Sequence, residues 1–324
     1  MIKSEEPDVE EEELPSTASD VPLSRTGSLY LLATMAASST FFDAPASLPP
    51  LHIIPDYAAI LDSSLGDSIT GNTGAEPEPL IDAVLFLGFL IVNERPKLIS
   101  DDDLVYNNIL RRLSLLSANM PSPVLRYHAH LLTCSLLHSH PEDHFRLAFI
   151  RDTLEHCPFE NLKASAVGWL KDELLSADRP PNEKSVDAEP SIFATPATLE
   201  TLQPFLFPNV DALMEGQATT DSYATFQAHQ PFYLAVLNLL YLLLSSPSLF
   251  LRLGLADSLK QGPEHFSNFL NPLSDASRRF RTSILSEEMG YDDEESKEAA
   301  LAALELLNMS VQQVEDVITK TRET

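Results

Sequence analysis

Apolar residues recur at helical spacing along most of this 324-residue chain. In the stretch after residue 100, Val105, Ile109, Leu113 and Leu116 follow one another every three or four residues, which is the period of one face of an α-helix. No segment of four or more residues shows the convincing alternation of apolar and polar side chains that a half-buried β-strand produces. The pattern therefore predicts an all-α fold with minimal strand content.

Proline and glycine usage supports the same prediction. The chain holds 24 prolines and only 10 glycines, and several prolines lie where one helical pattern ends and the next begins. Pro121 and Pro123 close one turn, Pro141 occupies a position typical of the first residue of a helix, and Pro158 blocks its continuation. One helix is expected to begin at a cap at Ser100 and another at Glu160 or Asn161. Further helices are expected over 124–137, 140–157, 199–206, 226–244 and 263–285. The chain is expected to close with two helices, one over 299–307 and one that begins at Ser310, where Gln313 completes a capping box.

Trp169 lies on the helix whose apolar face carries Leu162, Ala166, Leu170 and Leu174. As the single tryptophan of the chain, it is expected to be a structural anchor that packs into a neighbouring helix. Its neighbour Gly168 interrupts that helix at a cost of about 1 kcal/mol relative to alanine. Close packing of a neighbouring helix would offset that cost.

Helices of this length joined by short turns predict stacked helical pairs. Because no sequence repeat has a fixed period, the expected architecture is an irregular HEAT-like helical-repeat solenoid, with a compact helical bundle as the alternative. The expected organisation is a disordered acidic tail over 1–27, a helical-repeat segment over 28–177, a polar linker over 178–197 and a second helical-repeat segment over 198–324 that continues the solenoid.

The formal net charge of −27, from 48 acidic and 21 basic residues, argues against nucleic acid as a direct partner. Neutralising phosphates requires clustered Lys and Arg. Two acidic runs stand out: residues 1–20 hold one Lys against eight acids, and residues 287–298 hold one Lys against seven. Both are interpreted as solvated tail or loop, with an acidic docking patch for a basic partner as the alternative.

Two apolar runs, over 80–92 and 232–244, are each about 13 residues long and fall short of the roughly 20 residues that a membrane span needs. We interpret them as buried core helices; a span remains the alternative only if the second run continues through Pro247. Cys134 and Cys157 cannot form a disulfide framework for a chain of this size, and no signal peptide opens the sequence. We therefore expect an intracellular protein, cytoplasmic or nuclear, without a membrane partner.

Histidines and cysteines are concentrated between residues 128 and 157. Of these, His130, Cys134 and His138 share one helical face at i, i+4 and i+8. A tetrahedral metal site needs donors that converge, whereas these three span about 12 Å of helix. No metal ligand or cofactor is assigned, and a metal- or thiol-dependent redox role for this region is kept as the alternative function. The cluster comprises His128, His130, Cys134, His138, His140, His144, His156 and Cys157.

Catalytic signatures are missing from the sequence. It contains no G-x-S-x-G, no G-x-x-x-x-G-K-[ST] and no H-E-x-x-H, and no catalytic residue is proposed. One contrast remains: residues 104–175 carry seven basic and seven acidic residues and are neutral within a very acidic chain. These cations are either ordinary solvated charges or a positive strip that recognises an acidic protein segment. The candidate binding residues are Arg126, Arg146, Arg151, Lys163 and Lys171.

Three segments carry a resemblance to a known family. The run CPFENLKASAVGWLKDE (157–173), the preceding RLAFIRDTLE (146–155) and the later PFYL (231–234) resemble fungal proteins of the YAP-binding, aberrant-lateral-root-formation and glomulin family. The resemblance covers residues 80–285, is specific around 141–175, and matches the C-terminal portion of longer members.

Members of that family are helical-repeat proteins without catalytic activity, so the resemblance implies a non-enzymatic adaptor with no cofactor. Fungal members act in the oxidative-stress response, by binding a bZIP transcription factor so that a peroxidase can oxidise it, and in kinetochore function. Glomulin binds a RING protein and restrains a cullin ubiquitin ligase. The partner implied here is thus a bZIP factor or a RING/cullin component. No family site residue maps onto this sequence.

Overall fold

The computed structural model describes residues 17, 21–42, 50–65, 76–94, 102–178, 190–215, 218–256, 259, 264–291 and 293–323. Within these ranges the chain is helical and contains no strand, which confirms the predicted all-α class. Residues 1–16 and 18–20 of the predicted disordered tail lie outside the described residues.

The helices follow one another along the chain with short connections. Their bounds are α1 Arg25–Phe42, η2 Ile53–Tyr57, α2 Ala58–Ser64, α3 Glu78–Glu94, α4 Asp103–Asn119, α5 Pro123–Ser139, α6 Asp143–His156, α7 Glu160–Asp178, η4 Ile192–Ala194, α8 Pro196–Leu206, α9 Val210–Met214, α10 Thr219–Ser245, α11 Pro247–Arg252, α13 Glu264–Leu285 and α14 Glu294–Glu323.

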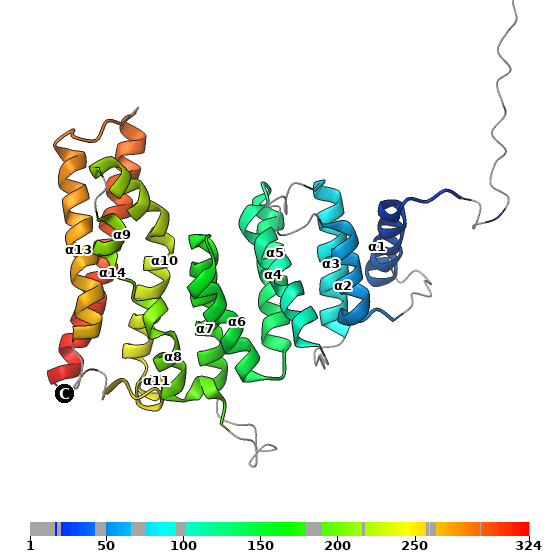
Figure 1. Cartoon of the computed structure of the whole chain (residues 1–324), viewed down its shortest axis with the longest axis horizontal. Coiled ribbons are helices and arrows are strands. Elements are labelled where there is room, and N and C mark those ends of the chain that lie inside the picture. The colour runs from blue at the N-terminus through cyan, green and yellow to red at the C-terminus, as the bar shows by residue number, and fades with distance from the viewer. Residues whose placement is uncertain are drawn as a thin grey trace, which may run out of the picture.

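The helices stack side by side into an elongated body, with α1 at one end and α13 and α14 at the other (Figure 1). Packing runs from α3 to α5, from α4 to α5 and α7, from α7 to α10, and from α10 to α14. Each helix packs on elements that lie within a few places of it along the chain, as in a helical-repeat solenoid. The irregular solenoid is therefore the observed arrangement, and the compact-bundle alternative is not.

Three consecutive connections in the middle of the stack share one design. The turns 120–122, 140–142 and 157–159 each hold three residues with a proline at the centre: Pro121, Pro141 and Pro158. Proline lacks an N–H and cannot continue the preceding helix, so each one ends a helix sharply. The short turns bring α4 against α5 and α6 against α7.

Two helix starts differ from the sequence prediction. The cap of α4 is Asp102, not Ser100: its carboxylate accepts hydrogen bonds from the backbone N–H groups of Leu104 and Val105, both at 3.1 Å. Helix α6 begins at Asp143, so Pro141 lies in the turn before the helix and not at its first position. Adjacent residues of similar capping quality made these starts ambiguous in the sequence.

The predicted closing pair of helices is wrong. Helix α14 runs unbroken through Glu294–Glu323, and Ser310 lies in its interior. The Ser310 hydroxyl donates to the Leu306 carbonyl at 2.9 Å, one turn earlier, so it does not cap a new helix. Val311, Val314 and Ile318 continue the buried face begun by Leu304 and Leu307, and that continuity keeps the helix in one piece.

Helix α10 contains the second of the two apolar runs. By length and composition it could cross a membrane, and it is the one described helix that passes this test. In the fold it packs against α7 and α14, and Phe232, Tyr233, Val236 and Leu240 are buried there. This matches the interpretation of the run as a core helix.

The predicted linker over 178–197 includes structured residues at its end. The single turn η4 and the first residues of α8 fall within it, and α8 packs on α6 while η4 packs on α7. Helix α1 likewise begins inside the predicted tail, at Arg25. The division of the chain into two helical segments stays a prediction.

Candidate functional site

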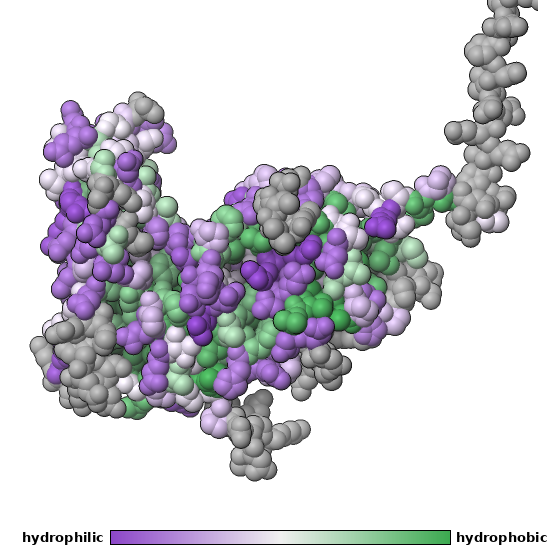
Figure 2. Space-filling model, in the orientation of Figure 1, coloured by the Kyte–Doolittle hydropathy of each residue, from purple (hydrophilic) through white to green (hydrophobic). Residues whose placement is uncertain are grey.

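Helix α5 exposes a row of large apolar side chains. Val124, Tyr127 and Leu131 are 61%, 59% and 37% solvent-exposed, at i, i+3 and i+7 on one face of the helix. The opposite face is buried through Leu125, Ala129, Leu132 and Leu136. Exposed apolar side chains that gather on one element mark interaction sites more often than isolated ones do. The space-filling view shows apolar surface breaking the hydrophilic surface over the middle of the stack (Figure 2).

A groove of about 340 Å³ lies between α5 and α7, towards the C-terminal ends of both helices. Helix α4 packs against both of them. The groove mixes apolar, thiol, hydroxyl and carboxylate groups, which is the composition of a protein-binding surface more than of an enclosed ligand cavity. Its lining residues are Cys134, Ser135, Leu137, His138, Trp169, Asp172, Glu173, Leu175 and Ser176.

Trp169 forms part of this groove, and only 3% of it is exposed. Its ring lies 5.6 Å from that of Phe149 on α6, centroid to centroid, so the predicted structural anchor is buried against a neighbouring helix. The indole N–H lies near the Cys134 thiol and lowers its pKa, but it makes no hydrogen bond of normal geometry with any described residue. Trp169 thus ties α7 to α6 and also borders the groove.

One side of the groove is fixed by a buried carboxylate. Glu173 is 4% exposed, and its two oxygens lie 3.1 Å from His138 Nδ1 and 3.0 Å from Arg146 Nε. The hydrogen bond to Glu173 raises the pKa of His138 above its usual 6.5. Because these three residues come from α5, α7 and α6, they hold three helices in register.

The surroundings of both cysteines in this region raise the pKa of the thiol. Burial raises the pKa of the Cys134 thiol to about 11, although His130 Nε2 lies 3.5 Å from its sulfur. Burial also lowers the pKa of His130, which keeps this imidazole neutral beside the thiol. Burial raises the pKa of Cys157 as well. Since the thiolate is the reactive form, these environments disfavour thiol chemistry.

Histidine side chains in this part of the chain point to separate partners. His138 bonds Glu173, while His140 is buried with its ring stacked 3.9 Å from that of Phe145 and its Nε2 3.4 Å from Asp103. Exposed His156 lies near Asp152. Within the part of the chain that the structure describes, no three His, Cys, Asp or Glu side chains gather as a metal site would require.

Gly168 lies in the middle of α7 with open space where its side chain would be. A Cβ built at this position meets no atom within 4 Å outside its own helix. The close packing of a neighbouring helix that was expected to offset its cost is therefore wrong. Gly168 lies one turn before Asp172 and two turns before Leu175, so the three share the outward side of α7.

Four of the five cations predicted to bind a partner have intramolecular contacts. Arg126 donates to the carbonyls of Met120 and Pro121 at 2.7 and 3.0 Å, and closes the α4–α5 turn. Arg151 pairs with Glu155 at 3.2 Å, and Lys163 pairs with Glu160 at 2.9 Å.

Arg146 makes the most intramolecular bonds of the five cations. Only 11% of its side chain is exposed, and its guanidinium bonds Glu173, Asp143 and the carbonyl of His140. Lys171, the fifth, is exposed on α7. A positive binding strip stays a prediction, although most of its members already serve the fold.

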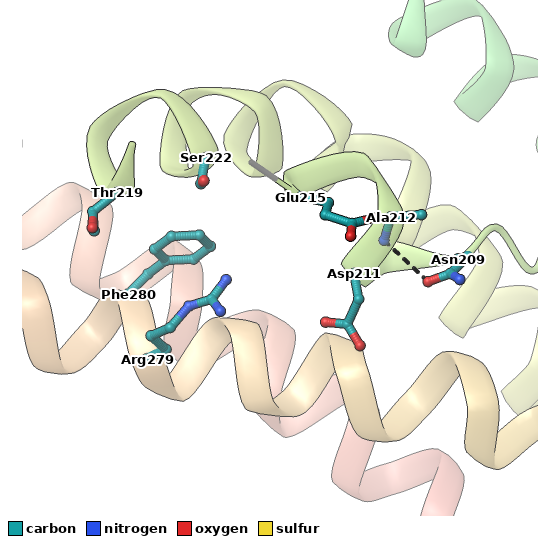
Figure 3. Close-up of a pocket in the computed structure, with 8 residues that line it drawn as sticks. All are labelled: Asn209, Asp211, Ala212, Glu215, Thr219, Ser222, Arg279 and Phe280. Atoms are coloured by element: carbon teal, nitrogen blue, oxygen red, sulfur yellow. Dashed lines mark hydrogen bonds between the residues drawn. The ribbon is translucent and has the colours of Figure 1, made fainter. Parts of the chain in front are cut away.

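A second hollow lies at the far end of the stack, between α9, α10 and α13 (Figure 3). It encloses about 520 Å³. Asn209 caps α9 by accepting from the Ala212 N–H at 3.2 Å, and the Asp211 and Glu215 carboxylates lie on the same side. Across the hollow, the Arg279 guanidinium lies over the Phe280 ring, 5.0 Å from its centroid. Two carboxylates and one guanidinium line this hollow, so its charge is mixed and no single ligand class is assigned to it.

Comparison with known proteins identifies the chain at the level of its family. The family model described as an uncharacterised protein family, YAP/Alf4/glomulin, matches residues 2–310. The chain belongs to this family. Membership indicates a protein-interaction adaptor role and a protein partner in general. A search of curated proteins returned no match.

The exposed row on α5 is the feature that sequence reasoning missed. The signal was present, because Val124, Tyr127 and Leu131 are apolar at helical spacing on the side opposite to the core face. A helix that is apolar on two sides is either buried or covered by a partner. Sequence alone does not show which side the rest of the fold covers.

Proposed function

We propose that this chain is a non-enzymatic adaptor that binds a regulatory protein through the α5–α7 side of its solenoid. The observation that carries the proposal is the exposed apolar row Val124, Tyr127 and Leu131, which lies on the helix that borders the α5–α7 groove. Such a row is costly to leave in water and gains free energy when a partner covers it.

The partner and pathway follow from the resemblance of residues 146–173 to fungal family members. We propose a bZIP transcription factor in the oxidative-stress response as the partner, with a RING/cullin component or a kinetochore protein as the other family possibilities. A cytoplasmic or nuclear location accords with each of these partners. The half-buried thiols of Cys134 and Cys157, whose pKa values are raised, accord with an adaptor whose own cysteines take no part in redox chemistry.

Affinity capture from native extract with the full chain, followed by binding of the purified candidate to the purified chain, tests the proposal. We expect one regulatory protein to bind directly at a fixed stoichiometry. Turnover of a substrate by the purified chain, or failure of every captured protein to bind it directly, would contradict the adaptor role.

The redox alternative needs a separate measurement. Elemental analysis of the purified chain and titration of its two thiols distinguish the two functions. The adaptor role predicts no stoichiometric metal and two slowly reacting thiols. Stoichiometric zinc, or a thiol that reacts rapidly at neutral pH, would favour the His/Cys region as a functional centre.

A further inference from the structure

The α5–α7 surface has four features that together define an occupant. The first two are the apolar row along α5 and the groove of about 340 Å³ between α5 and α7. The eight residues of helix from Val124 to Leu131 span about 10 Å, or two turns. An apolar row of this length matches one face of a partner helix better than a single inserted side chain.

Gly168 is the third feature. Glycine weakens a helix interior, and neither a turn nor a packed neighbour inside the described fold requires it here. A missing side chain on the outward side of α7 lowers that surface and leaves room for the backbone of another helix to approach closely. Close approach over small residues is how helices pack at short distances.

The fourth feature is the charge of the groove. Asp172 is exposed at its rim and has no ion pair or hydrogen bond with any described residue. Its negative charge acts to raise the pKa of the neighbouring His130, Cys134 and His138 side chains. Glu173 is already paired, so Asp172 supplies the free negative charge of the groove. A basic side chain on the occupant would complement it.

We propose that this surface binds an amphipathic helix of a partner protein, laid along α5 and α7, with an apolar face against Val124, Tyr127 and Leu131 and a Lys or Arg directed at Asp172. The inference rests on the proposed adaptor function and adds the class of segment that is recognised. It differs from the positive strip expected from the sequence, which would select an acidic segment.

Fluorescence anisotropy with labelled peptides and the full chain tests the proposal. The probe is a helical peptide of about 18 residues, with leucine at i, i+3, i+7 and i+10 and lysine beside that row. The matched peptide carries glutamate in place of each lysine. We expect the lysine peptide to bind and the glutamate peptide to bind at least about tenfold more weakly. Equal binding of the two peptides, or binding of neither, would overturn the proposal.

Variants of the chain locate the binding. Gly168→Gln adds a side chain to the lowered surface while improving helix propensity, so loss of binding in this variant would not come from loss of helix. We expect Gly168→Gln and Tyr127→Gln each to weaken the lysine peptide by about tenfold. Leu306→Gln, at an exposed apolar residue on α14, is the matched control and should leave binding unchanged.

Charge exchange at Asp172 provides a readout that a structural defect would not mimic. Asp172→Lys should weaken the lysine peptide and strengthen the glutamate peptide, reversing the preference. A lysine peptide that binds equally well to the Gly168→Gln, Tyr127→Gln and Asp172→Lys chains would place the site elsewhere and overturn this inference. It would leave the adaptor function intact, because that function depends on direct binding of a captured partner.

Discussion

Glu173 places a carboxylate inside the protein, and its neighbours show how that charge is accommodated. A buried charge costs several kcal/mol unless an opposite charge and hydrogen bonds compensate it. Arg146 and His138 supply both, at 3.0 and 3.1 Å. Arg146 also bonds Asp143 and lies over the Phe193 ring, 5.7 Å from its centroid. Arg146 therefore links α6 to Glu173 on α7 and to Phe193 in η4.

Arg146→Met should lower the free energy of unfolding by about 3–5 kcal/mol, because it leaves Glu173 and Asp143 partly buried without their cation. Urea denaturation followed by circular dichroism measures the change. Arg151→Met is the matched control: Arg151 is half exposed, pairs with Glu155 and lies 5.8 Å from the centroid of the Phe205 ring, so its loss should cost about 1 kcal/mol. Equal losses in the two variants would show that the Arg146 cluster contributes no more than a surface pair.

His138 should make stability depend on pH in a defined direction. Its pKa in the folded chain is raised above 6.5 by the hydrogen bond to Glu173. The folded state therefore binds this proton more tightly than the unfolded chain does, and the extra stability is complete below about pH 6. It is lost as pH rises through the folded pKa.

His138→Gln removes that dependence while keeping a hydrogen-bond donor. The difference in unfolding free energy between the parent and His138→Gln should favour the parent more at about pH 6 than at about pH 8. Both chains contain His130, whose pKa is lowered by burial, so its opposite effect on the pH dependence of stability cancels in this difference. A difference that is flat with pH would mean that the His138–Glu173 contact does not persist in solution.

At the scale of single helices, α7 combines a fully buried apolar face with a glycine that has no packed neighbour. Its inner face buries Leu162, Ala166, Leu170 and Leu174 as the spacing predicts. Its outer side carries Gly168 above open space. The contrast with Gly88 on α3 is direct, because a Cβ there would lie 2.5 Å from the Tyr57 hydroxyl and 2.6 Å from a Leu132 methyl. One glycine is required by packing and the other is not.

Gly168→Ala should raise the free energy of unfolding by up to about 1 kcal/mol, because alanine is the better helix former and nothing obstructs its methyl group. Gly88→Ala should lower it, since the added methyl would overlap Tyr57 and Leu132. Thermal denaturation of both variants gives the comparison. A destabilised Gly168→Ala chain would mean that Gly168 has a packing partner inside the fold.

The sequence predicted the existence of most helices but not their limits or their contacts. The stretches α4 to α7 were recognisable because local period and proline turns determine them. The unbroken α14 was not recognisable, because Ser310 and Gln313 match the pattern of a helix cap when tertiary packing is not considered. The exposed row on α5 was missed for the same reason, since the exposure of Tyr127 and Leu131 depends on which sides of α5 the other helices cover.

Across the whole molecule, the two halves of the chain are joined by contacts that cross the predicted linker. Helix α7 packs on α10, the Ser248 hydroxyl donates to Asp178 at 2.6 Å, and Arg252 donates to the carbonyl of Ala177 at 3.2 Å. The Ile192 N–H donates to the second oxygen of Asp143 at 3.1 Å. The cluster that fixes α5, α6 and α7 thus also holds η4, the structured end of the predicted linker.

These contacts predict that covalent continuity over residues 179–189 is not what keeps the halves together. A chain with a protease site placed there should, after complete cleavage, still elute as one particle on size exclusion, with the helical circular dichroism of the uncut chain. In a solenoid each element depends on its neighbours for burial, so separating α7 from α10 would expose apolar surface on both. The same chain left uncut is the control. Two separate, fully helical fragments after cleavage would instead make 28–177 and 198–324 independent domains, and the solenoid would end at α7.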